Sequence, residues 1–170
     1  AGFWFQYSGI TSSITGFMSV SEGWNMISLP VVQSDNRKST LFPSAESNAF
    51  TFINGYEPKD TLESGVGYWL NFSEGQAFQF NGSATTTETL DVADKWNMIG
   101  CLSYPVDVST IVPIGTSVSS QYFGFSSSNG YTSTTTLLPG KGYWVKVSGA
   151  GKLILQTGNL MNSITATVSH

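Results

Sequence analysis

Three acidic residues have the side chains best suited to acid–base chemistry in this sequence. Glu57, Asp60 and Glu63 lie close together in the chain. A glycosidase needs two carboxyl groups about 5 to 10 Å apart, one of which holds its proton. The positions 75 residues further on, in the second copy of an internal repeat, carry no acid: they are Thr132, Thr135 and Leu138. We therefore expect a solvated acidic loop and no enzyme activity, with a glycosidase that uses these three acids as the alternative.

Other catalytic and metal-binding chemistry lacks the residues it needs. The only histidine is the last residue, His170, which we interpret as the remnant of a purification tag. Without an internal imidazole, Ser–His–Asp and Cys–His arrangements are not expected. The single cysteine, Cys101, lies in an apolar run and is expected to be a buried structural thiol. Asp91 and Asp94 could supply oxygen ligands to calcium, but no calcium-loop motif surrounds them, so we expect no cofactor, with calcium as the alternative.

Aromatic side chains are the remaining candidates for a ligand-binding site. A Trp or Tyr ring can stack on the apolar face of a sugar while neighbouring polar groups bind its hydroxyls. Strand alternation places Trp69 and Trp144 on faces that also carry polar residues, and Tyr56 and Tyr131 directly follow predicted hairpin tips. The six predicted ligand-binding residues are Trp69, Trp144, Tyr56, Tyr131, Tyr122 and Tyr104.

The aromatic residues differ in their expected roles. Tyr104 and Tyr122 are included because neither follows the repeat pattern of its neighbours, as expected if one copy acquired binding on its own. For the four repeated candidates, packing or turn anchoring is the alternative role. Trp24 and Trp96 lie in strands with apolar residues on both faces, and we expect them in the core.

An internal repeat organises the whole chain. The segment Trp-Asn-Met-Ile at residues 24–27 recurs at 96–99, a shift of 72, and Gly-x-Gly-Tyr-Trp at 65–69 recurs at 140–144, a shift of 75. Three shorter matches lie in order between these anchors, residues 41–43 with 111–113, 50–52 with 123–125, and 54–56 with 129–131. We predict an N-terminal linker or edge segment at 1–13, β repeats at 14–85 and 86–160, and a terminal strand with the tag remnant at 161–170.

The local pattern predicts an all-β fold. Asn-Gly pairs at 54–55, 81–82 and 129–130 are typical of hairpin tips. The runs between turns are short and partly alternating, and only segments 30–49 and 105–120 leave room for a helical turn. We expect about five or six strands per repeat, packed about a pseudo-twofold axis into a sandwich-like or barrel-like module with one hydrophobic interior. Residues 13–15 resemble 163–165, so the terminal strand either closes the fold or begins a third copy.

Composition limits the classes of partner. The chain has 170 residues, a net charge of −4 and only 11% charged residues, so it has no basic stripe for nucleic acid. No apolar run approaches the roughly 20 residues of a membrane span. The start carries neither an initiator Met nor a signal-peptide pattern, so we expect a segment of a larger polypeptide with neighbouring domains.

Two segments resemble a known module. Residues 23–30, GWNMISLP, and 139–145, PGKGYWV, resemble the tandem "GWNLIS…PGxGYWV" β-repeat module of bacterial secreted and cell-surface multidomain proteins. Ser64 and Lys95 depart from it where Pro and Gly are usual. The resemblance implies a secreted, extracellular accessory role without a single assigned activity. We expect binding to a polysaccharide or cell-surface glycan, with a structural, adhesive or surface-anchoring module without glycan affinity as the alternative.

Overall fold

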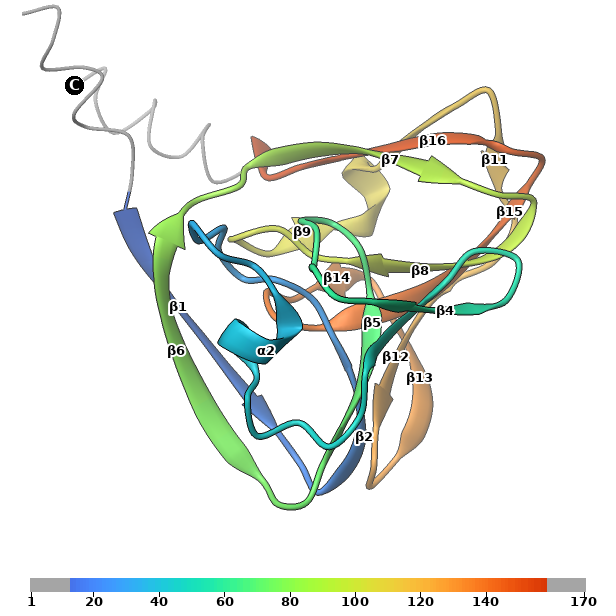
Figure 1. Cartoon of the computed structure of the whole chain (residues 1–170). Coiled ribbons are helices and arrows are strands. Elements are labelled where there is room, and N and C mark those ends of the chain that lie inside the picture. Colours follow the sequence, from blue (N-terminus) through green and yellow to red (C-terminus); the bar gives the residue numbers. More distant parts are fainter. Residues whose placement is uncertain (1–12, 159–170) are drawn as a thin grey trace, which may run out of the picture.

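The computed structural model describes residues 13–158 and is almost entirely built from antiparallel strands (Figure 1). The first unit contains β1 (Ser13–Val20), β2 (Gly23–Ile27), the helical turn α2 (Lys38–Leu41), β3 (Ala49–Phe52), β4 (Tyr56–Lys59), β5 (Tyr68–Phe72) and β6 (Gln76–Ser83). The all-β prediction is confirmed, and α2 falls within segment 30–49, which left room for a helical turn.

The second unit follows without a break. It contains β7 (Thr87–Val92), β8 (Lys95–Gly100), β9 (Val106–Asp107), the 3-10 turn η1 (Val108–Thr110), β10 (Val112–Ile114), β11 (Ser117–Val118), β12 (Tyr122–Ser126), β13 (Gly130–Thr134), β14 (Thr136–Leu137), β15 (Gly142–Ser148) and β16 (Gly151–Gln156). The turn η1 also lies where helical structure was allowed.

Each unit combines a larger sheet with a smaller one, which has two strands in the first unit and three in the second. The first has a sheet in the order β2-β5-β3-β4 and pairs β1 with β6. The second has a sheet in the order β11-β15-β12-β13, with β8 also on β15, and pairs β7 with β16, which in turn carries β10. Strand β1 therefore belongs to the first unit, while the predicted terminal strand at 161–170 lies outside the described residues.

Two of the three Asn-Gly predictions hold. Residues 54–55 join β3 to β4, with positive φ at both positions, and 129–130 join β12 to β13. The pair 81–82 is instead in the body of β6, where Gly82 lies opposite Ile14. The prediction of a turn there is wrong because Gly82 serves close packing: a Cβ at this position would collide with the backbone of Val32.

Equivalent residues of the two units make equivalent hydrogen bonds. The Asn25 side chain accepts from the backbone N of Ser21 at 3.0 Å, and Asn97 accepts from Ala93 at 2.9 Å. The buried Tyr68 hydroxyl accepts from the N of Glu63 at 2.8 Å. The Tyr143 hydroxyl accepts from Leu138 at the same distance. These matched contacts support the predicted duplication.

The buried apolar side chains of residues 13–158 form two clusters, one in each unit. Phe42, Phe72 and Phe80 are central to the first, and Leu102, Leu137 and Leu153 belong to the second. The expectation of one shared interior is therefore wrong. The reason is that each large sheet buries one face within its own unit, which leaves its other face for contact with the neighbouring unit.

Reciprocal backbone contacts join the units. The N–H of Ser28 donates to the Gly140 carbonyl at 3.0 Å, and the N–H of Gly100 donates to the Gly65 carbonyl at 2.7 Å. Gly65 and Gly140 have φ values of +81° and +82°, in the left-handed region. The second glycine of each Gly-x-Gly motif lies against the other unit, where a Cβ on Gly67 would be 2.7 Å from the Ile99 carbonyl oxygen. The motif is thus both a turn and the junction between the units.

One departure from the repeat leaves a residue with strained backbone. Lys95 has φ +79°, whereas its counterpart Gly23 has φ +92°. A side chain in this region is disfavoured, while glycine adopts it freely. We predict that Lys95→Gly raises the free energy of unfolding by about 0.5–1 kcal/mol, because relief of strain exceeds the added entropy of the unfolded chain. Urea denaturation measures this change. The reciprocal Gly23→Lys should destabilise, and a loss of stability in Lys95→Gly would contradict the explanation.

Candidate ligand-binding surface

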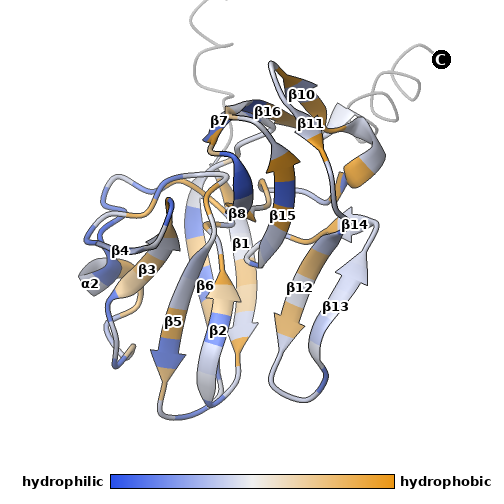
Figure 2. Cartoon of the chain, turned by 90° about the vertical axis from the view of Figure 1, so that its right-hand side faces the viewer, coloured by the Kyte–Doolittle hydropathy of each residue, from blue (hydrophilic) through white to orange (hydrophobic). Residues whose placement is uncertain are grey.

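Ten aromatic side chains gather where the large sheets of the two units meet, and we call this surface the aromatic face. Its members are Trp24, Phe50, Phe52, Tyr56 and Trp69 from the first unit and Trp96, Phe123, Phe125, Tyr131 and Trp144 from the second. Strand β12 runs beside β2, which brings the two sheets together at this surface (Figure 2).

Strand alternation explains why these rings share one side of each sheet. In the first sheet Trp69 lies opposite both Met26 and Phe50 in the strand pairing, so the three side chains point the same way. Trp24 lies two residues before Met26, and Phe52 lies two residues after Phe50, so their side chains point to the same side of the sheet. The opposite side of the sheet, which carries Ile27, Tyr68 and Leu70, faces the core of the unit.

The predicted burial of Trp24 and Trp96 is wrong. Their exposed fractions are 43% and 39%, so both side chains are exposed and neither lies in a core. Their strands do carry apolar residues on both faces, but only the Ile27 and Ile99 face belongs to a core. The other unit covers only part of the sheet face that carries Trp24 or Trp96. The extent of this cover cannot be read from the sequence.

The ring contacts repeat with nearly the same geometry in both units. Trp24 lies 6.5 Å from Trp69 at an interplanar angle of 90°, and Trp96 lies 6.4 Å from Trp144 at 87°. Three ring contacts cross the junction: Trp69 with Phe125 at 5.0 Å, Trp144 with Phe52 at 5.2 Å, and Trp144 with Tyr56 at 6.5 Å. Trp69 and Trp144 therefore each pack between a tryptophan of their own unit and a phenylalanine of the other unit.

Two open hollows lie between these rings. The first has a volume of about 520 Å³ and the second about 410 Å³, both within the range of small-molecule sites. The first is lined by Trp24, Phe50, Tyr56, Trp69, Phe125 and Tyr131. The second is lined by Phe52, Trp96, Phe123, Tyr131 and Trp144. Every described residue that lines them is aromatic, so the hollows offer mainly the faces and edges of rings.

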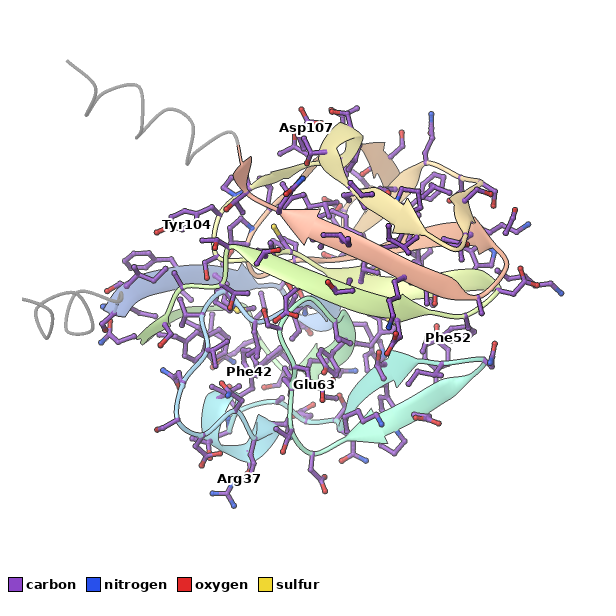
Figure 3. The ribbon with its side chains drawn as sticks, turned by 90° about the horizontal axis from the view of Figure 1, so that it is seen from above. Arg37, Phe42, Phe52, Glu63, Tyr104 and Asp107 are labelled. Carbon is purple, nitrogen blue, oxygen red and sulfur yellow. The ribbon has the colours of Figure 1, made fainter. Side chains whose placement is uncertain are left out.

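Four of the six predicted ligand-binding residues come together on this surface. Tyr56 and Tyr131 are 57% and 54% exposed, and Trp69 and Trp144 are half-buried. Tyr122 is buried in the second core, because it alternates away from Phe123, and it is removed from the candidate site. Tyr104 lies in the segment after β8, and Figure 3 places it far across the molecule from Phe52.

Sequence reasoning missed the other members of the face. The four phenylalanines carry a usable signal, because Phe-x-Phe at 50–52 and 123–125 has the period of two that puts both rings on one side of a strand. Trp24 and Trp96 had no such signal, since their exposure depends on how the two units are placed.

The predicted acidic residues do not converge. Glu57 forms an exposed ion pair with Lys59 at 3.4 Å, and Asp60 is exposed beyond the end of β4. Glu63, labelled in Figure 3, is the only one of the three that lines a separate hollow of about 700 Å³, which it shares with Glu88. Burial raises the pKa of Glu88, and the negative charge of Glu63 adds to that rise.

The remaining candidates for metal or thiol chemistry have other partners. Asp91 is paired with Lys152, and Asp94 accepts a hydrogen bond from the N of Gly149 at 2.8 Å. Among residues 13–158 no group of three or more His, Cys, Asp or Glu side chains could hold a metal. Cys101 is buried, as predicted, and burial raises the pKa of its thiol to about 12. A thiol with so high a pKa is poorly nucleophilic at neutral pH.

No helix in the described part of the chain has the length and apolar character needed to cross a membrane.

Comparison with known proteins found no matching family model, no matching curated protein and no matching solved structure.

Proposed function

We propose that this protein is a non-catalytic, extracellular accessory module that binds polysaccharide through the aromatic face. The observation that carries the proposal is the pair of exposed hollows lined by Trp, Phe and Tyr, which occur at matching positions in the two units. Secretion and attachment to neighbouring domains are parts of the same proposal, and they rest on the low charged content and the resemblance of the two motifs.

Aromatic hollows suit sugars for a physical reason. A pyranose ring carries its axial C–H groups on its faces, and these apolar faces stack on aromatic rings, while Tyr hydroxyls and Trp N–H groups can bind hydroxyls at the rim. Exposed rings already held by their neighbours lose little side-chain freedom when a ligand binds. Trp69 and Trp144 have this support, since each packs against rings of both units.

The alternative is a structural, adhesive or surface-anchoring module without glycan affinity. That function predicts full burial of all four repeated tryptophans, because each would serve packing alone. Trp24 and Trp96 are instead exposed beside the hollows. This difference favours ligand binding.

The experiment is glycan binding by a double variant. Truncating a central aromatic anchor costs roughly 2 kcal/mol, or more than tenfold in affinity. We expect the native chain to bind in a glycan array and in affinity gels, and Trp24→Ala/Trp96→Ala to lose that binding while keeping its far-ultraviolet circular dichroism.

Phe17→Ala is the matched control. Phe17 is 67% exposed but lies on β1, outside the aromatic face. It should bind like the native chain. Equal binding by the double variant, or no binding of any glycan by the native chain, would refute the proposal.

A further inference from the structure

We propose that the two hollows work as one continuous site for a single soluble chain of uncharged sugars, and not as a platform for a crystalline polysaccharide surface. This inference rests on the proposed function and adds the ligand class and the mode of binding. It is carried by the angles between the rings, the residues shared by the hollows, and the charge of their lining.

The ring angles give each hollow the shape of a cup. Trp24 and Trp69 are perpendicular, and so nearly are Trp96 and Trp144. The Phe50 ring is tilted by 52° against Trp24, and the Phe123 ring is tilted by 56° against Trp96. A crystalline polysaccharide presents a flat face, which would need coplanar rings. An open cup instead holds one sugar unit between two rings, with one ring against its face and another along its edge.

The two cups are continuous with each other. Tyr131 lines both hollows. Tyr56 lines the first, and its ring centre lies 6.5 Å from that of Trp144 in the second. These two tyrosines are exposed and stand at the border. Because Tyr131 is common to both cups, we infer that a chain that fills one cup can continue into the other.

The lining selects for ligand charge. Among residues 13–158 no charged side chain lines either hollow, so a carboxylate or sulfate placed there would lose hydration without gaining a partner. The net charge of −4 adds a general repulsion of polyanions. We place the link between successive sugar units at the border, beside Tyr56 and Tyr131, whose side chains carry hydroxyl groups. The fitting ligand therefore has apolar ring faces, neutral hydroxyls and a polar link.

The test is calorimetry with a length series. The probes are cello-, xylo- and chito-oligosaccharides from disaccharide to hexasaccharide, with polygalacturonate as the charged probe and crystalline cellulose and chitin as the flat probes. We expect two disaccharides per protein, bound weakly. One hexasaccharide should bind per protein with at least tenfold higher affinity, because occupation of the first cup makes entry into the second intramolecular.

Variants that lack the tryptophan of one cup distinguish a failure of this inference from a failure of the proposed function. Trp24→Ala and Trp96→Ala should each leave one disaccharide site and remove the gain with length, whereas Phe17→Ala should change neither. If the native chain binds these oligosaccharides without a gain in affinity with length, or prefers polygalacturonate or a crystalline surface, this inference is overturned while the proposed function stands. If it binds no glycan, or binds equally well after both tryptophans are removed, the proposed function fails as well.

Discussion

Replacing Gly67 by alanine is expected to lower the free energy of unfolding by about 2–3 kcal/mol, because the added methyl group would overpack the junction between the units. The new Cβ would lie 2.7 Å from the carbonyl oxygen of Ile99, and 3.1 and 3.3 Å from its carbonyl carbon and nitrogen. All three are backbone atoms of β8, so no flexible side chain can move aside. Strands β5 and β8 would have to separate, which also disturbs the Gly67 N–H bond to Met98.

Urea denaturation of a graded set of variants measures this effect. Gly142, the counterpart of Gly67, would place its Cβ 3.1 Å from the Ile27 carbonyl oxygen, so Gly142→Ala should cost less. An added Cβ on Gly158 meets no atom of the described residues within 4 Å, and Gly158→Ala should stay within about 0.5 kcal/mol of the native chain. If Gly67→Ala lowers the free energy of unfolding by less than about 0.5 kcal/mol, the junction is not as tightly packed as described.

Asn97→Ala is expected to cost about 3 kcal/mol, because one buried side chain satisfies three backbone groups of the turn before β8. Its amide oxygen accepts from the N of Ala93 at 2.9 Å, and its amide nitrogen donates to the carbonyls of Ala93 and Lys95 at 2.9 and 3.1 Å. Alanine would leave these groups without that partner. Asn97→Asp should also destabilise, since a carboxylate would face two carbonyl oxygens.

The first unit provides the comparison. Asn25 makes the same three bonds, to Ser21 and Gly23, but it is half-buried and its turn is more open to water. Water can replace part of what is lost there, so Asn25→Ala should cost less than Asn97→Ala. Chemical denaturation of both variants gives the order, and a larger loss for Asn25→Ala would contradict the assigned role of burial. This role explains why asparagine follows tryptophan in both copies of the motif.

The fold class could be predicted from the sequence because it depends on local features. Asn-Gly pairs, short alternating runs and two glycine-containing repeats indicate strands and turns wherever they occur. The error at 81–82 has the same origin, since Asn-Gly also fits a strand whose glycine meets another backbone. Gly82 does so beside Val32, which is distant in sequence.

The candidate site could be predicted only in part. Trp69, Trp144, Tyr56 and Tyr131 were found because alternation and hairpin position are local properties. The exposure of Trp24 and Trp96 was missed because it depends on how one unit covers the face of the other. Tyr122 was misplaced for a related reason: a residue that alternates away from an aromatic face points into a core, and here that core is the second unit's own.

The motif residues that recur in both units have different structural roles. The asparagine of each Trp-Asn pair secures a turn, the paired glycines allow the units to meet, and the tryptophans of both motifs turn toward the shared face.

The most direct test of the aromatic face as the binding site is a titration of the chain with a neutral hexasaccharide, followed through the indole N–H signals in nuclear magnetic resonance spectra. Single Trp→Phe variants assign the signals. We predict that the signals of Trp24, Trp69, Trp96 and Trp144 shift together and saturate at one ligand per chain. Saturable binding that leaves all four signals unmoved would place the ligand elsewhere and contradict the account.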